Sequence, residues 1–265
     1  MLKPKKIRIE KPEIDYSSWF IDLGELTIFT QKVLKQFFRP PFENRELIKQ
    51  GYYIGYKTLP LISITGFIMG LVLTMQIRPI LVDFGATSQL PGLIAVAIVR
   101  EIGPVITGLI CAGKISSGIA AEIGAMKVSE QIDAMEVSGT KPLGFVVATR
   151  VLATTLLVPL LVIVSNTFGL LGSFIALNMS EIFTVTNFIN SAFDTIHFSD
   201  IIPATIKTIF FGFFIGLIGS YKGYQASQST EAVGLAANVA VVTASLNIFV
   251  IDLLAVLVTK FFVSY

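Results

Sequence analysis

The chain has 265 residues, of which 53% are hydrophobic and only 14% are charged. A soluble domain carries about 25% charged residues, so most of this chain has too few polar groups to cover a surface in water. With a single histidine (His197), we expect no histidine-based metal cluster and no catalytic triad built from this chain alone. The single cysteine (Cys111) excludes an intramolecular disulfide. The composition predicts an all-α integral membrane protein with no metal site.

Residues 1–57 form a basic N-terminal segment. Residues 1–15 are charged and carry two prolines, and we expect little order there. From Ser17 apolar and aromatic residues recur every three or four positions, with Lys32 and Lys35 among them, until Pro40 and Pro41 end the pattern. This predicts an amphipathic helix lying in the membrane interface. The alternative is a small soluble helical domain, but the segment is too short for a core of its own.

Five apolar stretches follow, and each is long enough to cross a bilayer, which takes about 20 residues. Residues 43–57 lead into the first of them and carry Tyr52, Tyr53 and Tyr56, which suit the headgroup level. The expected spans are Thr58–Ile77, Pro91–Cys111, a stretch within Phe145–Leu177, Ile201–Tyr221 and Val233–Val263. Residues 58–265 are therefore predicted to form one five-span domain.

Basic residues predict the orientation of this domain. Eleven of the twenty lysines and arginines precede the first span, and others lie at 113–145 and 222–232. The first connection holds only Arg78, and the third holds no lysine or arginine. The positive-inside rule then places the N-terminus and the segments 113–145 and 222–232 in the cytoplasm, and the C-terminus outside.

Charged residues inside the spans are the candidate functional groups. Glu101, Lys207 and Asp252 lie about 15, 9 and 16 Å below the outer membrane edge, counted at 1.5 Å per helical residue. A charge at this depth costs at least about 2.5–3.5 kcal/mol, so it faces protein or water. We expect either a structural ion pair or a polar cavity or gate. Arg100 adjoins Glu101 but lies about 100° around the helix.

A short acidic helix is predicted near residues 129–138, between the second and third spans. Ser129 suits its N-cap and Gly139 its end. Its acidic and apolar residues would dock into a groove of a partner, and the alternative is a solvated loop. The docking residues are Glu130, Gln131, Ile132, Asp133, Met135 and Glu136, with Val137 as a further apolar contact.

Two glycine patterns give only weak indications of function. The pairs Gly66/Gly70 and Gly212/Gly216 allow close helix approach, either within the chain or between two copies. Gly113 and Lys114 complete part of a phosphate-binding loop, but Ile115 stands where a hydroxyl is required. We interpret that partial match as chance, so any ATPase driving transport is another polypeptide.

Residues 100–139, REIGPVITGLICAGKISSGIAAEIGAMKVSEQIDAMEVSG, closely resemble the signature of the MlaE/YrbE permease family. The resemblance extends over most of the chain and includes Gly223, Tyr224 and Ala226. It implies a lipid-transport subunit of an ABC transporter in a bacterial inner membrane, with a plastid envelope as the lesser alternative. It also implies a homodimer, two cytoplasmic ATPase subunits that hold ATP and magnesium, a periplasmic ring of MCE-domain proteins, and a phospholipid substrate.

The resemblance further implies that the 129–138 helix couples ATP-driven motion to the spans. A lipid cavity would lie between two copies, lined by the first, second and fifth spans and by apolar side chains such as Leu71, Met75 and Leu93. Two other hypotheses stay open: an ion-coupled carrier or channel that uses Glu101, Lys207 and Asp252, and a lipid-modifying membrane enzyme. The enzyme ranks last because no nucleophile–base set is present in the sequence, and nothing points to a bound cofactor or nucleic acid.

Overall fold

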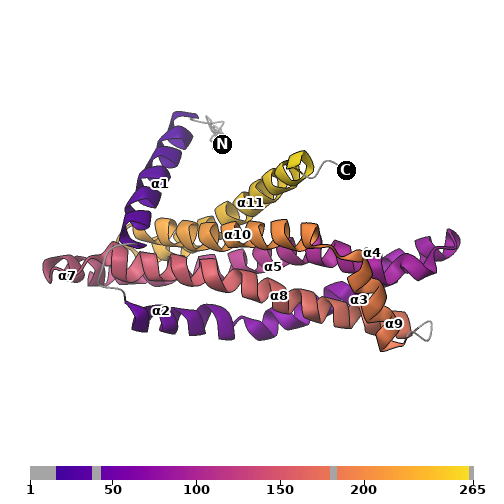
Figure 1. Cartoon of the computed structure of the whole chain (residues 1–265). Helices are drawn as coiled ribbons and strands as arrows, with labels where there is room; N and C mark the ends of the chain where they lie inside the picture. Colours follow the sequence, from indigo (N-terminus) through magenta and orange to yellow (C-terminus); the bar gives the residue numbers. More distant parts are fainter. Residues whose placement is uncertain (1–15, 38–42, 180–183, 263–265) are drawn as a thin grey trace, which may run out of the picture.

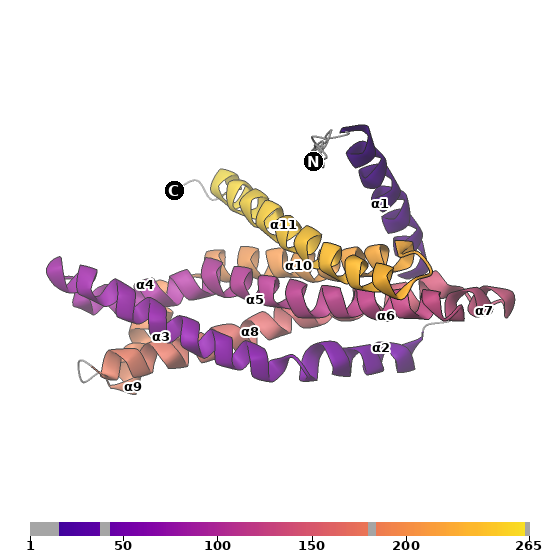
Figure 2. The same ribbon diagram turned by 180° about the vertical axis from the view of Figure 1, so that it is seen from behind.

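The structure, a computed structural model, describes residues 16–37, 43–179 and 184–262, with side chains from residue 24 onward and up to 261. Every regular element in these ranges is a helix. The helices run side by side in an elongated bundle, with α7 at one end and α4 and α9 at the other (Figures 1 and 2). The basic residues 1–15 and the two prolines at 40 and 41 lie outside the described ranges.

Five helical stretches are long and apolar enough to cross a membrane, which confirms the five-span prediction. The first comprises α2 (Asn44–Gly51), the π-helical η1 (Tyr52–Tyr56) and α3 (Leu59–Asp83). The second comprises η2 (Thr87–Gln89), α4 (Leu90–Ala97), η3 (Ile98–Ile102), α5 (Gly103–Cys111), η4 (Ala112–Ser116) and α6 (Ser117–Val128). The other three are η5 (Leu143–Ala148) with α8 (Thr149–Asn178), then α10 (Phe198–Gln225), then α11 (Thr230–Phe262). Outside them lie α1 (Tyr16–Phe37), α7 (Gln131–Val137) and α9 (Val185–Thr195).

The second helical stretch is longer than expected. Residues 113–128 were predicted to belong to a polar connection, yet the helix continues through η4 and α6 to Val128. The small residues of this part pack closely instead of forming a loop. A Cβ on Gly219 or Gly223 of α10 would lie 2.6 or 2.7 Å from the carbonyl oxygen of Ser116 or Ala120. Small side chains on both helices therefore bring the two backbones together.

Helix α8 is the centre of the bundle. It packs against α3 on one side and α10 on the other, and the most apolar part of its span is 61% buried, against 11% for α11. A Cβ on Gly66 or Gly70 would collide with the backbone of Ser165 or Gly169, and one on Gly212 with that of Thr154. Both glycine pairs thus serve packing within the chain, which decides between the two alternatives left open by the sequence.

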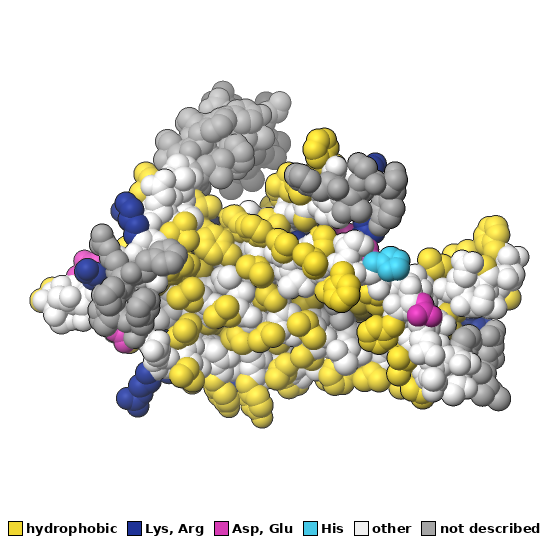
Figure 3. Space-filling model, in the orientation of Figure 1, with side chains coloured by type: hydrophobic (Ala, Val, Ile, Leu, Met, Phe, Trp, Pro, Cys, Tyr) yellow, Lys and Arg dark blue, Asp and Glu magenta, His cyan; other side chains and the backbone are white. Residues whose placement is uncertain are grey.

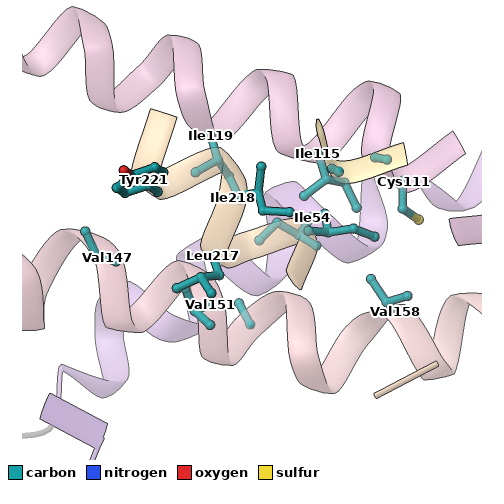
Figure 4. Close-up of a cluster of buried hydrophobic side chains, with 14 of the residues drawn as sticks. Ile54, Cys111, Ile115, Ile119, Val147, Val151, Val158, Leu217, Ile218 and Tyr221 are labelled. Carbon is teal, nitrogen blue, oxygen red and sulfur yellow. The ribbon is translucent and has the colours of Figure 1, made fainter. Parts of the chain in front are cut away.

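Apolar side chains from four helical stretches fill the middle of the bundle. Ile54, Ile115, Val151 and Leu217 come from different stretches and meet there (Figure 4). Because lipid is as apolar as these side chains, close packing rather than removal from water holds such helices together. Outward-facing apolar side chains cover the long side of the bundle (Figure 3).

Helix α1 leaves the bundle at the α7 end (Figure 1). It contacts η5 and the end of α10 through Phe29 and Val33, which are buried, while Ile28 and Leu34 stay exposed. The Phe29 ring lies 5.3 Å from that of Tyr221. A helix docked by one edge with apolar residues left exposed is compatible with a position in the membrane interface.

Candidate functional site

Glu101 lies in the π-helical turn η3 in the middle of the second stretch. Pro104 has no N–H to donate to the carbonyl of Arg100, and Gly103 donates instead to Ile98, five residues back. The extra residue in this turn changes the helix face on which the following side chains emerge. Such π-helical turns are frequent at functional sites.

The Lys207 ammonium joins three helical stretches. Its Nζ donates to Glu101 Oε2 at 2.5 Å and to Asp252 Oδ1 at 2.8 Å. The Lys207 side chain is 4% exposed, that of Asp252 is 20% exposed and that of Glu101 is 38% exposed. The structure therefore brings together the three charges that the sequence placed at similar depths.

Arg100 belongs to the edge of the same cluster. Its Nη1 lies 3.5 Å from Asp200 Oδ1, in the first turn of α10, and not against Glu101. Arg100, Asp200 and Lys207 line a cavity of about 10 Å³, which is just large enough for one water molecule. In this conformation the cluster closes the space between α10, α11 and η3 and leaves no room for a lipid headgroup.

The predicted docking helix is present as α7 (Gln131–Val137), but its start differs from the prediction. Ser129 does not cap it: its hydroxyl donates back to Ala125 and closes α6. Glu130 precedes α7 and adopts a left-handed backbone with φ of 57°, which is uncommon for a residue with a side chain. Gly139, with φ of 80°, follows the helix end.

Helix α7 presents an exposed face and a buried one. Ile132 is 3% exposed and Met135 is half-buried, so these two anchor α7 to the bundle. Exposed positions are Glu130, Gln131, Asp133, Glu136 and Val137. Val137, the further apolar residue of the predicted docking helix, is 90% exposed.

Tyr224, at the end of α10, connects α7 to α1. Its hydroxyl donates to Glu136 Oε1 at 3.4 Å, and its backbone carbonyl accepts from Lys127 at 2.7 Å. Its ring lies 6.0 Å from that of Phe29. Through its side chain and its carbonyl, Tyr224 links the end of α10 to α1, α6 and α7.

The side chains expected to line a lipid cavity lie on the surface of the single chain. Met75 is 49% exposed and Leu93 is 46% exposed, while Leu71 is half-buried near Gly172 of α8. None of the three lines a cavity described above or below for the single chain. Any cavity that they line needs another surface opposite them.

The chain matches a known protein family over most of its length. The sequence profile of the family described as Permease MlaE matches residues 47–258. The chain belongs to the MlaE permease family.

Three curated relatives place this MlaE permease among transporter subunits. It is 32% identical to a probable ABC transporter permease protein of Rickettsia typhi, over 86% of this chain and 88% of the relative. It is 30% identical to a probable ABC transporter permease protein of Synechocystis, over 94% and 92% of the two chains. It is 33% identical, over 78% and 79%, to a protein of Haemophilus influenzae called intermembrane phospholipid transport system permease protein MlaE.

Sequence reasoning missed two charged contacts in this permease. Asp200 precedes the expected fourth span, Ile201–Tyr221, but α10 begins at Phe198, and the place of Asp200 in its first turn brings it to Arg100. Arg150 lies inside the expected third span, where it is 2% exposed and pairs with Glu122 of α6 at 2.7 Å. Its Nη1 also donates to Val146 at 2.6 Å.

Proposed function

We propose that this chain is the membrane subunit of an ABC transporter that moves phospholipids between the inner membrane and MCE-domain proteins. ATP hydrolysis takes place on a separate ATPase subunit, and this chain holds no cofactor. Membership of the MlaE family, together with a relative named for intermembrane phospholipid transport, carries the proposal. The N-terminus and α7 face the cytoplasm, and the C-terminus faces the periplasm.

Helix α7 is the docking element for the ATPase in this account. Its exposed acidic residues and Val137 suit a groove with basic and apolar walls. Its buried Ile132 and the Tyr224–Glu136 contact attach it to the bundle. Motion of the ATPase would therefore reach α10 and then Lys207 on the same helix.

The transporter contains two copies of this chain. Helix α11 is the least buried span and exposes apolar side chains along its length, among them Leu246, Phe249 and Leu253. Met75 and Leu93 are exposed as well. A second copy would supply the opposite wall and enclose a lipid cavity between first, second and fifth spans.

The Glu101–Lys207–Asp252 cluster is proposed as the closed gate of this pathway, and a purely structural ion pair is the alternative. An ion-coupled carrier is less well supported because both carboxylates already accept from the same ammonium. A bound cation would have to compete with Lys207 for them. ABC-type permease relatives also favour ATP as the energy source.

Co-purification tests the docking role of α7. The detergent-solubilised protein is co-expressed with the products of its neighbouring genes, as wild type and as Glu130→Lys/Glu136→Lys. The matched control, Asp83→Lys/Asp194→Lys, reverses two exposed acids at the opposite end of the bundle. We expect wild type and control to retain an ATPase and the α7 variant to lose it. A wild type that purifies alone in several mild detergents would remove the main support for the proposal.

A further inference from the structure

A second cavity lies on the α7 half of the bundle, away from the charge cluster. It measures about 240 Å³ and separates the start of the first span from η4 and α6. Its walls are Gln50, Tyr53, Ile54 and Thr58 on one side and Lys114, Ile115, Gly118, Ile119 and Glu122 on the other. Ile54, Ile115 and Ile119 are labelled in Figure 4. Lys114 is about 20 Å from Glu101 along the helix axis, so the two sites are separate.

One buried polar group in the wall has no partner. The Thr58 side chain is fully buried, and its Oγ1 makes no hydrogen bond within the described part of the chain. Buried hydroxyls are nearly always hydrogen-bonded, and each exception requires an explanation. An oxygen atom of a ligand in this cavity would provide the missing partner.

Lys114 lines the cavity and Lys57 lies beside the wall residue Tyr53, and neither lysine has an acidic partner among the described residues. Lys114 Nζ donates to the backbone carbonyl of Lys57 at 2.5 Å, and Lys57 Nζ lies 4.1 Å from the centre of the Tyr53 ring. Among the described residues, no carboxylate lies within ion-pair distance of either lysine. The acid in the wall, Glu122, is already paired with Arg150 at 2.7 Å. The cavity therefore offers uncompensated positive charge.

The cavity lies at the level where the lipid-facing surface ends. On one side of Thr58, the exposed residues of α3 are apolar, beginning with Leu61 and Ile64. On the other side, Tyr52 and Tyr56 are exposed, as expected for side chains among headgroups. A Cβ on Gly118 would meet no atom within 4 Å, so the wall is open beside it.

We propose that this cavity binds the phosphate of a phospholipid from the leaflet on the α7 side, and that it prefers anionic headgroups. Lys57 and Lys114 pair with the phosphate oxygens, and the Thr58 hydroxyl donates to one of them. Gly118 leaves room for the glycerol, while the acyl chains follow Leu61 and Ile64. This lipid joins the first and second spans near α7, and its binding does not depend on the transport function proposed above.

Photolabelling in nanodiscs tests the site. The full-length protein is placed in phosphatidylcholine discs with a trace of photoactivatable phosphatidylglycerol, and labelled peptides are mapped by mass spectrometry. We expect labels within residues 50–61 and 113–122. Lys57→Gln/Lys114→Gln should lower labelling by about fivefold for each lysine removed, which is the contribution of one lysine near an anionic surface. Lys141→Gln, an exposed lysine at the same end outside the cavity, should label as wild type.

Two further variants separate loss of the site from loss of the fold. Gly118→Phe fills the open wall and should abolish labelling, whereas Gly234→Phe, at another glycine with open space, should not. All variants are compared only after eluting as wild type in size exclusion. Equal labelling of the double lysine variant, or labels confined to other peptides, would overturn the proposal. Equally strong labelling by a soluble photoactivatable glycerol phosphate would also overturn it, because the site would then select free phosphate compounds rather than lipid.

Discussion

Replacing Lys207 with methionine should destabilise the protein more than neutralising one of its partners. The ammonium is buried and donates to carboxylates on two other helical stretches. Without it, Glu101 and Asp252 face each other uncompensated, and removing one partner of a buried ion pair costs about 3–5 kcal/mol. Glu101→Gln leaves the Lys207–Asp252 pair in place, so we expect a loss of only about 1–3 kcal/mol.

The triple variant Glu101→Gln/Lys207→Met/Asp252→Asn provides the control. It removes all three charges, so no unpaired charge stays buried, and its stability should recover most of the loss. The assay is the fraction of detergent-solubilised protein that elutes at the native volume after heating. The lowest midpoint should belong to Lys207→Met. A Lys207→Met midpoint equal to wild type, or a triple variant as unstable as the single one, would refute this reasoning.

The same triple variant distinguishes a gate from a structural ion pair. If the cluster only holds helices together, a stable triple variant should transfer lipid at the wild-type rate. If the cluster gates the pathway, transfer should fall although the protein is folded. The comparison requires the stability result first, because an unfolded variant transfers nothing.

Two further substitutions test the packing of the bundle. Gly70→Ala should cost about 1–3 kcal/mol in folding stability, because its Cβ would collide with the carbonyl of Gly169. Gly113→Ala, in open space within a helix, should unfold at or slightly above the wild-type temperature, because alanine favours a helix over glycine. Glu122→Gln should destabilise by about 3 kcal/mol or more, because it leaves the buried Arg150 guanidinium without its carboxylate partner, and Arg150→Met should lower the heating midpoint less because the Glu122 carboxylate that it leaves unpaired is half-exposed. Equal midpoints within either pair would contradict the packing derived from the structure.

The spans were predictable because each is a long, predominantly apolar run with few charges. Their full lengths were not, because helix continues beyond the part that lies in lipid. Gly113 to Val128 resembles a polar loop in composition, but it is helical, and its small residues lie in close contact with Gly219 and Gly223 of α10. The composition of a segment does not show which other helix packs against it.

The charge cluster, too, was predictable only in part. Depth alone placed Glu101, Lys207 and Asp252 at one level, but depth does not fix the direction in which a side chain points. The π-helical turn before Pro104, and the position of Asp200 in the first turn of α10, set the actual partners. At α7, the helix itself was predictable from its apolar spacing, whereas the left-handed Glu130 was not.

The most direct test of the central claim is lipid transfer by the reconstituted protein. Liposomes would contain this chain with its co-purifying ATPase and MCE-domain partners, and transfer of a fluorescent phospholipid would be followed with and without ATP. We predict transfer that requires ATP and the ATPase and that persists when proton and sodium gradients are collapsed. Transfer or ion flux by this chain alone, driven by an ion gradient without nucleotide, would contradict the account.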